Sequence, residues 1–305
     1  MADATARPVD RIVAGYLVLS AVALAFPHRP GAWPLLVLLH LLAAAVLLAG
    51  VPDRYRWRPD EPGVRPSDSA ATPGPARRRQ QAAAIVADWY PLALVPLIYL
   101  EIQLLNTAVW DGHYFDGVIM GWEETLFGGQ PSVTLAMQWD SLLLSELLHL
   151  AYLSFYFVVY LFPLWLYLAG RRQQFRKTVF ALMLAFVAHY LVFVFFPVQG
   201  PRYLFPGPGG TQTDGFFYGL ARSVLESGSS QGAAFPSSHV ALAAVQTGNA
   251  LRFAPRVAPL LAVFTLGIAL GAVYGGFHYG IDATIGLLVG VGLALLAPPT
   301  WRALR

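Results

Sequence analysis

The sequence predicts an all-α fold, a polytopic membrane helical bundle with a six-helix core and two further N-terminal membrane helices. Three observations indicate this class. Hydrophobic residues make up 56% of the 305 residues and charged residues only 12%, whereas a soluble domain carries about 25% charged residues. The mean hydropathy is +0.54. The apolar residues form long runs, not the alternation of membrane-barrel strands. A water-soluble enzyme is therefore excluded.

Eight apolar stretches are candidate membrane spans, because a helix needs about 20 residues to cross the hydrocarbon core. They run over residues 12–26, 33–50, 90–109, 146–169, 178–196, 239–253, 258–274 and 282–297. The first, sixth and last are short, so we expect them to be tilted or extended by flanking residues.

Basic residues mark alternate loops. Most of them cluster in five segments, residues 7–11, 54–79, 171–177, 252–256 and 302–305. The positive-inside rule places these segments and both termini in the cytoplasm. Segment 110–145, in contrast, has five acidic residues and neither Lys nor Arg. We expect an integral protein of a bacterial plasma membrane, with residues 27–32, 110–145, 197–238 and 275–281 on the outer face.

The chain divides at a segment rich in Pro and Arg that lacks apolar periodicity. We expect a two-helix membrane segment over residues 1–51, a disordered cytoplasmic linker over 52–84, a six-helix catalytic core over 85–297 and a cytoplasmic tail over 298–305. Within the core, 110–145 is expected to be interfacial because it mixes aromatic residues with acids and glycines. The linker arginines are either a topology signal or a contact for anionic lipid. Residues 23–25 resemble a signal-peptide cleavage site, but we expect a retained first helix.

Three polar clusters lie at outer ends of the predicted spans, over residues 196–203, 234–239 and 274–282. In the third, His278 and Asp282 are four residues apart and would share one face of a helix. A carboxylate beside an imidazole fixes its tautomer and leaves the other nitrogen free as nucleophile or base. The alternative is a pair that merely ends a helix.

The other two clusters suit an anion. Ser237 and Ser238 precede a helix that begins near His239. Serine is a preferred N-cap, and helix N-termini bind phosphate. The segment is therefore either an ordinary cap or a phosphate cradle. Arg202 in the first cluster matches phosphate through its bidentate fork, or else it extends to lipid headgroups.

Together the clusters resemble the motifs of the type-2 phosphatidic acid phosphatase superfamily, most closely its inositol-phosphorylceramide synthase-like branch and related bacterial membrane proteins. The resemblance covers residues 85–297. Phe-Pro-Ser-Ser-His at 235–239 is similar to the second motif, and 273–282 is similar to the third at its His and Asp. Gly-Pro-Arg at 200–202 looks like the first motif.

The resemblance implies that His278 attacks phosphorus to give a phosphohistidine, with Asp282 orienting it. His239 would protonate the leaving alkoxide and later activate the acceptor. Arg202 and the serines at 237–238 would hold the phosphoryl oxygens, and no metal or other cofactor is implied. Water as acceptor gives a phosphatase, whereas a lipid hydroxyl gives a headgroup transferase.

The sequence departs from the common superfamily pattern at three positions. Phe195 stands where a lysine is expected, Ala272 where an arginine is expected, and Gly271 where a serine is expected. Two of three expected phosphate-binding cations are therefore replaced. Arg222, in the outer segment 197–238, is either a substitute cation or a solvated loop arginine.

Other polar residues are candidates for substrate binding. Glu146, His149 and Tyr152 have helical spacing at the outer end of the fourth span, where they either recognise a polar headgroup or form a buried hydrogen-bonded set. A metal site is not expected there, because di-metal bundles need a second Glu-x-x-His helix. Tyr203 and Tyr274 adjoin the first and third clusters.

Two ionisable residues lie inside predicted spans, Glu101 in the third and His189 in the fifth. Charged groups are costly in lipid, so both should face the bundle interior. There they are either structural hydrogen-bonding partners or part of the substrate route.

These patterns predict a metal-independent membrane enzyme that transfers or hydrolyses a phosphate-bearing headgroup of a membrane lipid. The alternative is a catalytically inactive lipid-binding or transport module with the same fold, favoured by Phe195 and Ala272. Nucleic acid is not an expected partner, because topology accounts for the basic runs.

Overall fold

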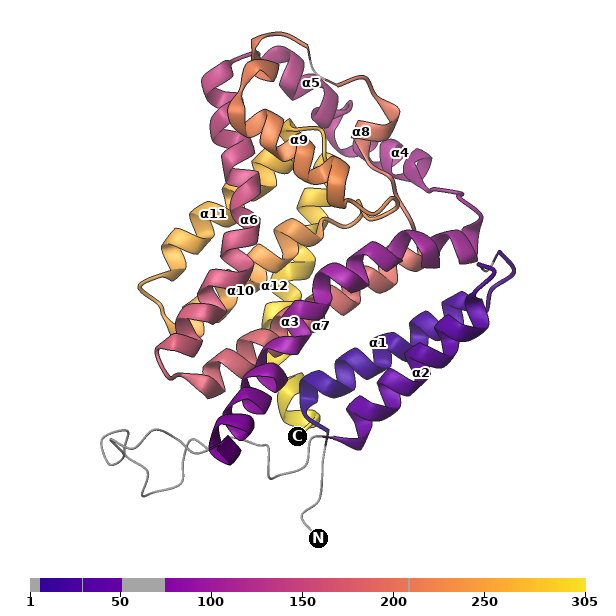
Figure 1. Cartoon of the computed structure of the whole chain (residues 1–305). Helices are drawn as coiled ribbons and strands as arrows, with labels where there is room; N and C mark the ends of the chain where they lie inside the picture. Colours follow the sequence, from indigo (N-terminus) through magenta and orange to yellow (C-terminus); the bar gives the residue numbers. More distant parts are fainter. Residues whose placement is uncertain (1–5, 29, 51–74, 208) are drawn as a thin grey trace.

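The computed structural model describes residues 6–28, 30–50, 75–207 and 209–305. Over these residues the chain is helical apart from loops and one isolated parallel bridge between Val198 and Ala233 (Figure 1). The predicted all-α fold is confirmed.

All eight predicted spans are helices. They are α1 (Pro8–Leu24), α2 (Trp33–Ala49), α3 (Pro75–Trp110), α6 (Leu142–Leu168), α7 (Arg172–Phe195), α10 (Ser238–Phe253), α11 (Ala258–Tyr274) and α12 (Gly280–Ala303). Among the described residues, α3, α6, α7 and α12 are long and apolar enough to cross a membrane, and α2 and α11 are shorter apolar helices. The protein is therefore an integral membrane protein.

Helix α3 begins earlier than the apolar run predicts. Of the predicted linker, residues 52–74 lie outside the described residues, whereas 75–84 already form the first turns of α3. The segment 76–84 contains only Ala, Arg and Gln. These residues favour helix without being part of an apolar run, so hydropathy alone did not detect them.

Helix α10 lies at the centre of the bundle, where it packs against α6, α7, α11 and α12. Its contact with α12 is very close. A Cβ on Gly286 would overlap the carbonyl oxygen of Ser237, and a Cβ on Gly290 would overlap that of Ala241. Small residues allow such close approach of membrane helices. The contact places the first turn of α10 beside the first turn of α12.

The N-terminal hairpin packs on the bundle through α1, which contacts α3 and α7. Helix α2 is mostly exposed, and Ala44 is its only buried residue. A polar contact inside the apolar region joins α2 to α3, because His40 Nε2 lies 2.8 Å from Glu101 Oε1.

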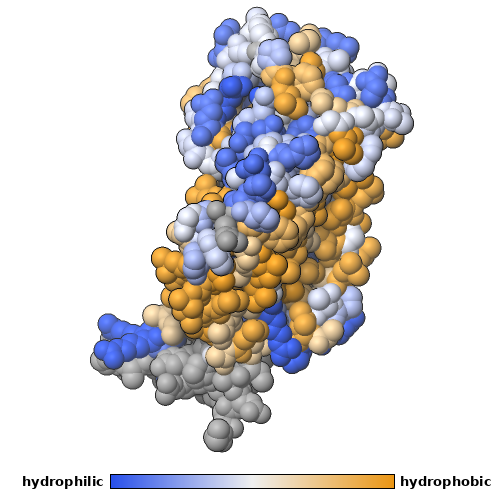
Figure 2. Space-filling model, turned by 90° about the vertical axis from the view of Figure 1, so that its right-hand side faces the viewer, coloured by the Kyte–Doolittle hydropathy of each residue, from blue (hydrophilic) through white to orange (hydrophobic). Residues whose placement is uncertain are grey.

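Short elements gather at one end of the bundle. They are α4 (Asp116–Phe127), α5 (Pro131–Gln138), α8 (Pro201–Leu204), the 3-10 helix Thr211–Asp214 and α9 (Phe216–Gly228). In Figure 1 they lie at the top, whereas α12 ends at the bottom. Figure 2 shows a wide apolar belt below this end, with hydrophilic residues above and below it. The loops that the charge pattern assigns to one face therefore share one end of the molecule.

Candidate active site

The three motif loops meet in space. Val198 N donates to the carbonyl of Gly232 at 3.2 Å, and Ala234 N donates to the carbonyl of Val198 at 2.9 Å. Gly200, with φ of +96°, lies where the loops touch, since a Cβ there would be 3.1 Å from both Ala234 Cβ and the Phe277 carbonyl oxygen. Only glycine adopts this conformation in so little space at no steric cost.

His239 occupies the first turn of α10, which Ser237 caps: its Oγ accepts from Val240 N at 3.5 Å. His239 Nε2 lies 3.4 Å from the hydroxyl of Tyr152 on α6. Its other ring nitrogen, Nδ1, has no hydrogen-bond partner among the described residues. The ring packs against Phe155, with centroids 4.2 Å apart. One face of this imidazole is thus fixed by aromatic side chains of α6.

His278 lies in the loop before α12. Its Nδ1 is 2.9 Å from the carbonyl oxygen of Ala234. Because a carbonyl only accepts, the proton lies on Nδ1 and Nε2 carries the lone pair. Burial, with a smaller contribution from the charge of Arg202, lowers the pKa of His278 to about 4. The imidazole is neutral at pH 7, as a nucleophile requires, and its ring centroid is 5.7 Å from that of His239.

Asp282 lies in the first turn of α12 and is fully buried. Its Oδ2 accepts from Tyr279 N at 2.9 Å, so the carboxylate caps the helix. The same oxygen is 3.6 Å from His278 Nδ1. His278 precedes the helix, so the two residues do not share a helical face. The carboxylate approaches the imidazole, but the closer partner of Nδ1 is the Ala234 carbonyl.

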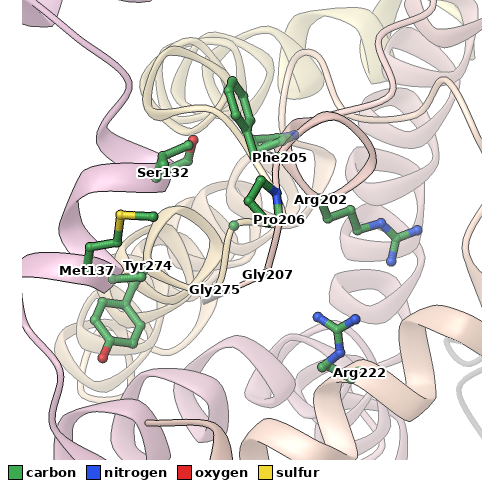
Figure 3. Close-up of a pocket in the computed structure, with 13 residues that line it drawn as sticks. Ser132, Met137, Arg202, Phe205, Pro206, Gly207, Arg222, Tyr274 and Gly275 are labelled. Atoms are coloured by element: carbon green, nitrogen blue, oxygen red, sulfur yellow. The ribbon is translucent and has the colours of Figure 1, made fainter. Parts of the chain in front are cut away.

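Arg202 lies on α8 and extends into a polar cavity of about 420 Å³. Its guanidinium donates to the hydroxyls of Tyr203 and Ser229 and stacks over the Tyr203 ring at 4.5 Å. Gln103, Arg222, Glu226 and Gln231 also line this cavity. Figure 3 shows a smaller adjoining pocket, with Arg202 and Arg222 from different elements at one side and their guanidiniums near each other.

An apolar cavity of about 300 Å³ is lined by residues of α3, α6, α7 and α9. Its lining includes Tyr99, Phe155, Tyr156, Tyr160, Tyr190 and Leu225. It ends at Ser238 and His239, and it shares Leu225 and Ser229 with the polar cavity. The two cavities therefore adjoin, one lined by two arginines and the other mostly by apolar side chains, and His239 lines the apolar one.

A protein-family model described as the PAP2 superfamily matches residues 118–297, more than half of the chain and all three motif loops. The chain belongs to the PAP2 superfamily. No curated protein and no solved structure matches it. PAP2 proteins are generally phosphatase-type enzymes that act on phosphorylated lipids.

The structure of this PAP2 protein gives a physical reason for two of its sequence departures. Ala272 is fully buried beneath Ala221 and Leu225 of α9, so helix packing fills the expected arginine position. A side chain on Gly271 would overlap the carbonyl oxygen of Leu148 on α6. The helix that covers Ala272 also carries Arg222, which supplies a cation to the pocket.

The expected lysine position is different. Phe195 ends α7 and is 39% exposed. Its side chain lines none of the three cavities described above. Nothing in the structure explains this substitution.

Of the three candidate binding residues on α6, only Tyr152 reaches the histidines. Glu146 Oε1 accepts from Phe217 N at 2.7 Å and from Tyr218 N at 3.3 Å, which caps α9. His149 is buried, and its Nδ1 is 2.7 Å from the carbonyl oxygen of Ser145. Neither Glu146 nor His149 lines any of the three cavities described above.

Of two other candidates, Tyr274 lies at a cavity and His189 is buried inside a helix. Tyr274 lines the small pocket, but its hydroxyl donates to the carbonyl of Trp139 at 2.9 Å. His189, inside α7, is buried with Nδ1 2.8 Å from the carbonyl oxygen of Ala185. No group of three or more His, Cys, Asp or Glu residues suited to a metal ion occurs in the part of the chain that the structure describes.

Two acids of this site are recognisable in the sequence only as charges of an outer loop. Asp116 and Glu123, both on α4, accept hydrogen bonds from the backbone of the first and third motif loops. Their partners are 83 or more residues away in the chain, so no spacing rule could identify them.

Proposed function

We propose that this PAP2 protein is a lipid phosphatase or phospholipid headgroup transferase that works through a phosphohistidine on His278. The observation that carries the proposal is the pair of imidazoles, 5.7 Å apart, of which His239 lines an apolar cavity that shares Leu225 and Ser229 with a cavity lined by two arginines. Neither cavity alone suits an amphiphile. Together they accommodate one, with the headgroup in the cavity lined by arginines and the acyl chain in the apolar cavity.

In the first step, His278 Nε2 attacks phosphorus while the bond to the leaving oxygen breaks. His239, which takes up a proton when the anionic phosphate binds beside it, donates that proton to the leaving oxygen. In the second step, His239 takes a proton from the acceptor hydroxyl, which attacks phosphorus as the phosphorus–nitrogen bond breaks. Arg202 and Arg222 stabilise the charge on the phosphoryl oxygens, which is the dominant task in phosphoryl transfer.

Further donors lie at the start of α10. Ser237 and Ser238 begin this helix, whose N-terminal dipole end favours an anion. In this proposal they support the phosphoryl group opposite the arginines, and Asp282 orients His278 through its buried carboxylate. Tyr152 holds His239, and Tyr203 supports the Arg202 guanidinium.

The acceptor distinguishes the two reactions. The replacement of two expected cations by Phe195 and Ala272 favours the inositol-phosphorylceramide synthase-like branch, in which the motifs are less strict. The basic loops favour both termini in the cytoplasm of a bacterium and the site on the outer face. A two-helix N-terminal segment over residues 1–51 and a catalytic core that ends at residue 297 are part of this proposal.

The test is a lipid-panel assay with purified wild type and His278→Ala. Labelled phosphatidic acid, phosphatidylinositol and a lipid diphosphate are offered with and without ceramide or diacylglycerol. We expect product release by the wild type and loss of at least about 10³-fold in His278→Ala. His113→Ala, which alters an exposed loop histidine, is the matched control and should keep full activity. Full product release by His278→Ala would contradict the mechanism.

A second candidate is an inactive lipid-binding or transport module. The replacement of two phosphate-binding cations by Phe195 and Ala272 favours it. Labelled phosphate trapped on histidine, or inhibition by vanadate, supports the enzyme. Absence of both across the panel, with lipid still bound, supports the module.

A further inference from the structure

Helix α4 carries two buried carboxylates that belong to none of the three motifs. Asp116 is 4% exposed and Glu123 is 0% exposed. Neither forms a salt bridge with a cation in the described residues. A buried carboxylate without a cation costs several kcal/mol unless hydrogen bonds compensate it. The hydrogen bonds that these two acids accept therefore identify the parts of the site that they hold in place.

Asp116 connects the first motif loop to the third. Its Oδ2 accepts from Gln199 N at 3.0 Å and its Oδ1 from Gly200 N at 2.9 Å. Oδ1 also accepts from the hydroxyl of Tyr279 at 3.0 Å. Arg202 follows two residues after Gly200, so the turn that Asp116 holds fixes the start of the helix that carries this arginine.

Glu123 holds the start of α12. Its Oε1 accepts from Gly280 N, the first residue of that helix. Gly280 has little room, because a Cβ there would lie 2.9 Å from the same oxygen. His278 lies two residues before Gly280, and Asp282 lies two residues after it. Glu123 thus acts on the loop between the nucleophile and its carboxylate.

The surroundings of Glu123 also shift its pKa, so that its protonation state changes near neutral pH. Burial, and then the nearby charge of Asp282, raise the pKa of Glu123 to about 7. The other polar groups on the packed elements are Asp116 on α4 itself and the phenol of Tyr279 before α12, whose pKa is raised by burial and by these acids. Glu123 Oε2 and Asp282 Oδ1 have no hydrogen-bond partner among the described residues.

We propose that Asp116 and Glu123 are positioning residues of the phosphoryl-transfer site. Asp116 sets the turn that carries Arg202, and Glu123 sets the start of α12 between His278 and Asp282. This inference rests on the proposed function. An ordinary helix cap would need neither a fully buried acid nor a carboxylate shared between two motif loops.

The experiment compares Asp116→Asn and Glu123→Gln with their exposed neighbours Asp111→Asn and Glu124→Gln as matched controls. Supporting groups of this kind typically contribute about 10–100-fold. We expect Asp116→Asn to raise KM for the phospholipid by about 10-fold, because Arg202 is displaced. We expect Glu123→Gln to lower kcat by about 10-fold with KM unchanged, and to remove the titration near neutral pH from the profile of kcat against pH.

A second readout separates this inference from the proposed function. Hydrogen–deuterium exchange, followed by mass spectrometry in detergent micelles, reports the amides at 199–200 and at 280. We expect faster exchange at 199–200 in Asp116→Asn and at 280 in Glu123→Gln, with the rest of the protein unchanged.

If wild type turns over no lipid, the proposed function fails, and exchange alone decides whether α4 holds the loops. If wild type is active but both variants keep its kcat, KM and pH profile, the inference is overturned while the proposed function stands. The inference is equally overturned if activity falls only in proportion to the loss of folded protein. Unchanged exchange at both sites also overturns it.

Discussion

Buried acids at the two ends of the bundle are stabilised in opposite ways. At the end where α1, α3 and α7 begin, Asp10 and Asp88 are 1% and 5% exposed. Arg7 Nη2 lies 2.8 Å from Asp10, and Arg176 Nε lies 2.8 Å from Asp88. Arg7 also approaches Asp88 at 3.9 Å. Each acid here is matched by a cation on a neighbouring helix or turn.

At the end that carries the motif loops, Asp116, Glu123 and Asp282 are also buried, at 4%, 0% and 0% exposed. Their partners are backbone amides and one phenol. The nearby cations, Arg202 and Arg222, point instead into the cavities.

The difference separates two uses of a carboxylate. A paired acid has a fixed charge and joins helices, whereas an acid held by amides has a charge that its neighbours can tune. The cations at the motif end stay available for a phosphate. The comparison therefore predicts that the first set of acids governs stability and the second set governs turnover.

The largest expected effect is at Asp282. Asp282→Asn keeps the side-chain volume and one acceptor for Tyr279 N, but it replaces the carboxyl group beside His278 with an amide. We expect kcat to fall by about 10²-fold or more, with the unfolding temperature close to that of wild type. Steady-state assays and thermal unfolding of the same preparation measure both. A variant that loses stability while each folded molecule retains wild-type kcat would place Asp282 with the structural acids.

The next largest effect is expected at the end of the bundle where α1, α3 and α7 begin. Asp88→Asn leaves Arg176 without its partner, and breaking a buried pair costs about 3–5 kcal/mol. Because Arg176 is 30% exposed, we expect about 2 kcal/mol of lost stability, with kcat per folded molecule unchanged. Asp111→Asn, with a side chain that is 72% exposed, is the control and should change neither. A fall in kcat without a fall in stability would break the comparison.

The long helices and the motif residues could be predicted from the sequence, because both depend on patterns of neighbouring residues. The apolar runs predicted all eight long helices, and α11 matches its predicted bounds, residues 258–274. The charge pattern and the position of the motifs at the ends of predicted spans predicted that His239, His278 and Asp282 lie at the same end of the bundle, where the His239 and His278 rings are 5.7 Å apart. The start of α3 was not predicted, because the residues at 76–84 favour helix without being apolar and so do not appear in a hydropathy pattern.

What the sequence did not predict depends on backbone partners far away in the chain. The spacing of Glu146 and His149 left open a headgroup site or a buried hydrogen-bonded set, and it did not identify their partners: Glu146 caps α9 and His149 bonds to its own helix. Asp116 and Glu123 were visible only as part of an acidic loop. A backbone amide leaves no residue-specific signal, so an acid that binds one resembles any other acid in the sequence.

A third effect concerns the pH dependence of stability. The pKa of Glu123 is raised from 4.5 to about 7 in the folded protein. The folded state therefore binds this proton more tightly than the unfolded state, and the stability linked to it is lost as pH rises from about 4.5 to about 7. We expect Glu123→Gln to remove this component, so that its unfolding temperature falls less than that of wild type between pH 5 and pH 8. Glu124→Gln should follow the wild-type curve, and parallel curves for all three proteins would contradict the assignment.

The smallest expected effect lies between the two ends, where Glu101 on α3 meets His40 on α2. Both side chains are partly exposed at the edge of the bundle, at 18% and 11%. Polar contacts between membrane helices contribute about 0.6 kcal/mol on average. We expect a double-mutant cycle with Glu101→Gln and His40→Ala to give a coupling of about 1 kcal/mol in unfolding. Turnover should be unchanged in all three variants, because neither residue lines a cavity that reaches the histidines. A loss of turnover that exceeds the loss of folded protein would instead place this pair with the acids of the motif end. Partnership with another side chain would then no longer distinguish structural acids from functional ones.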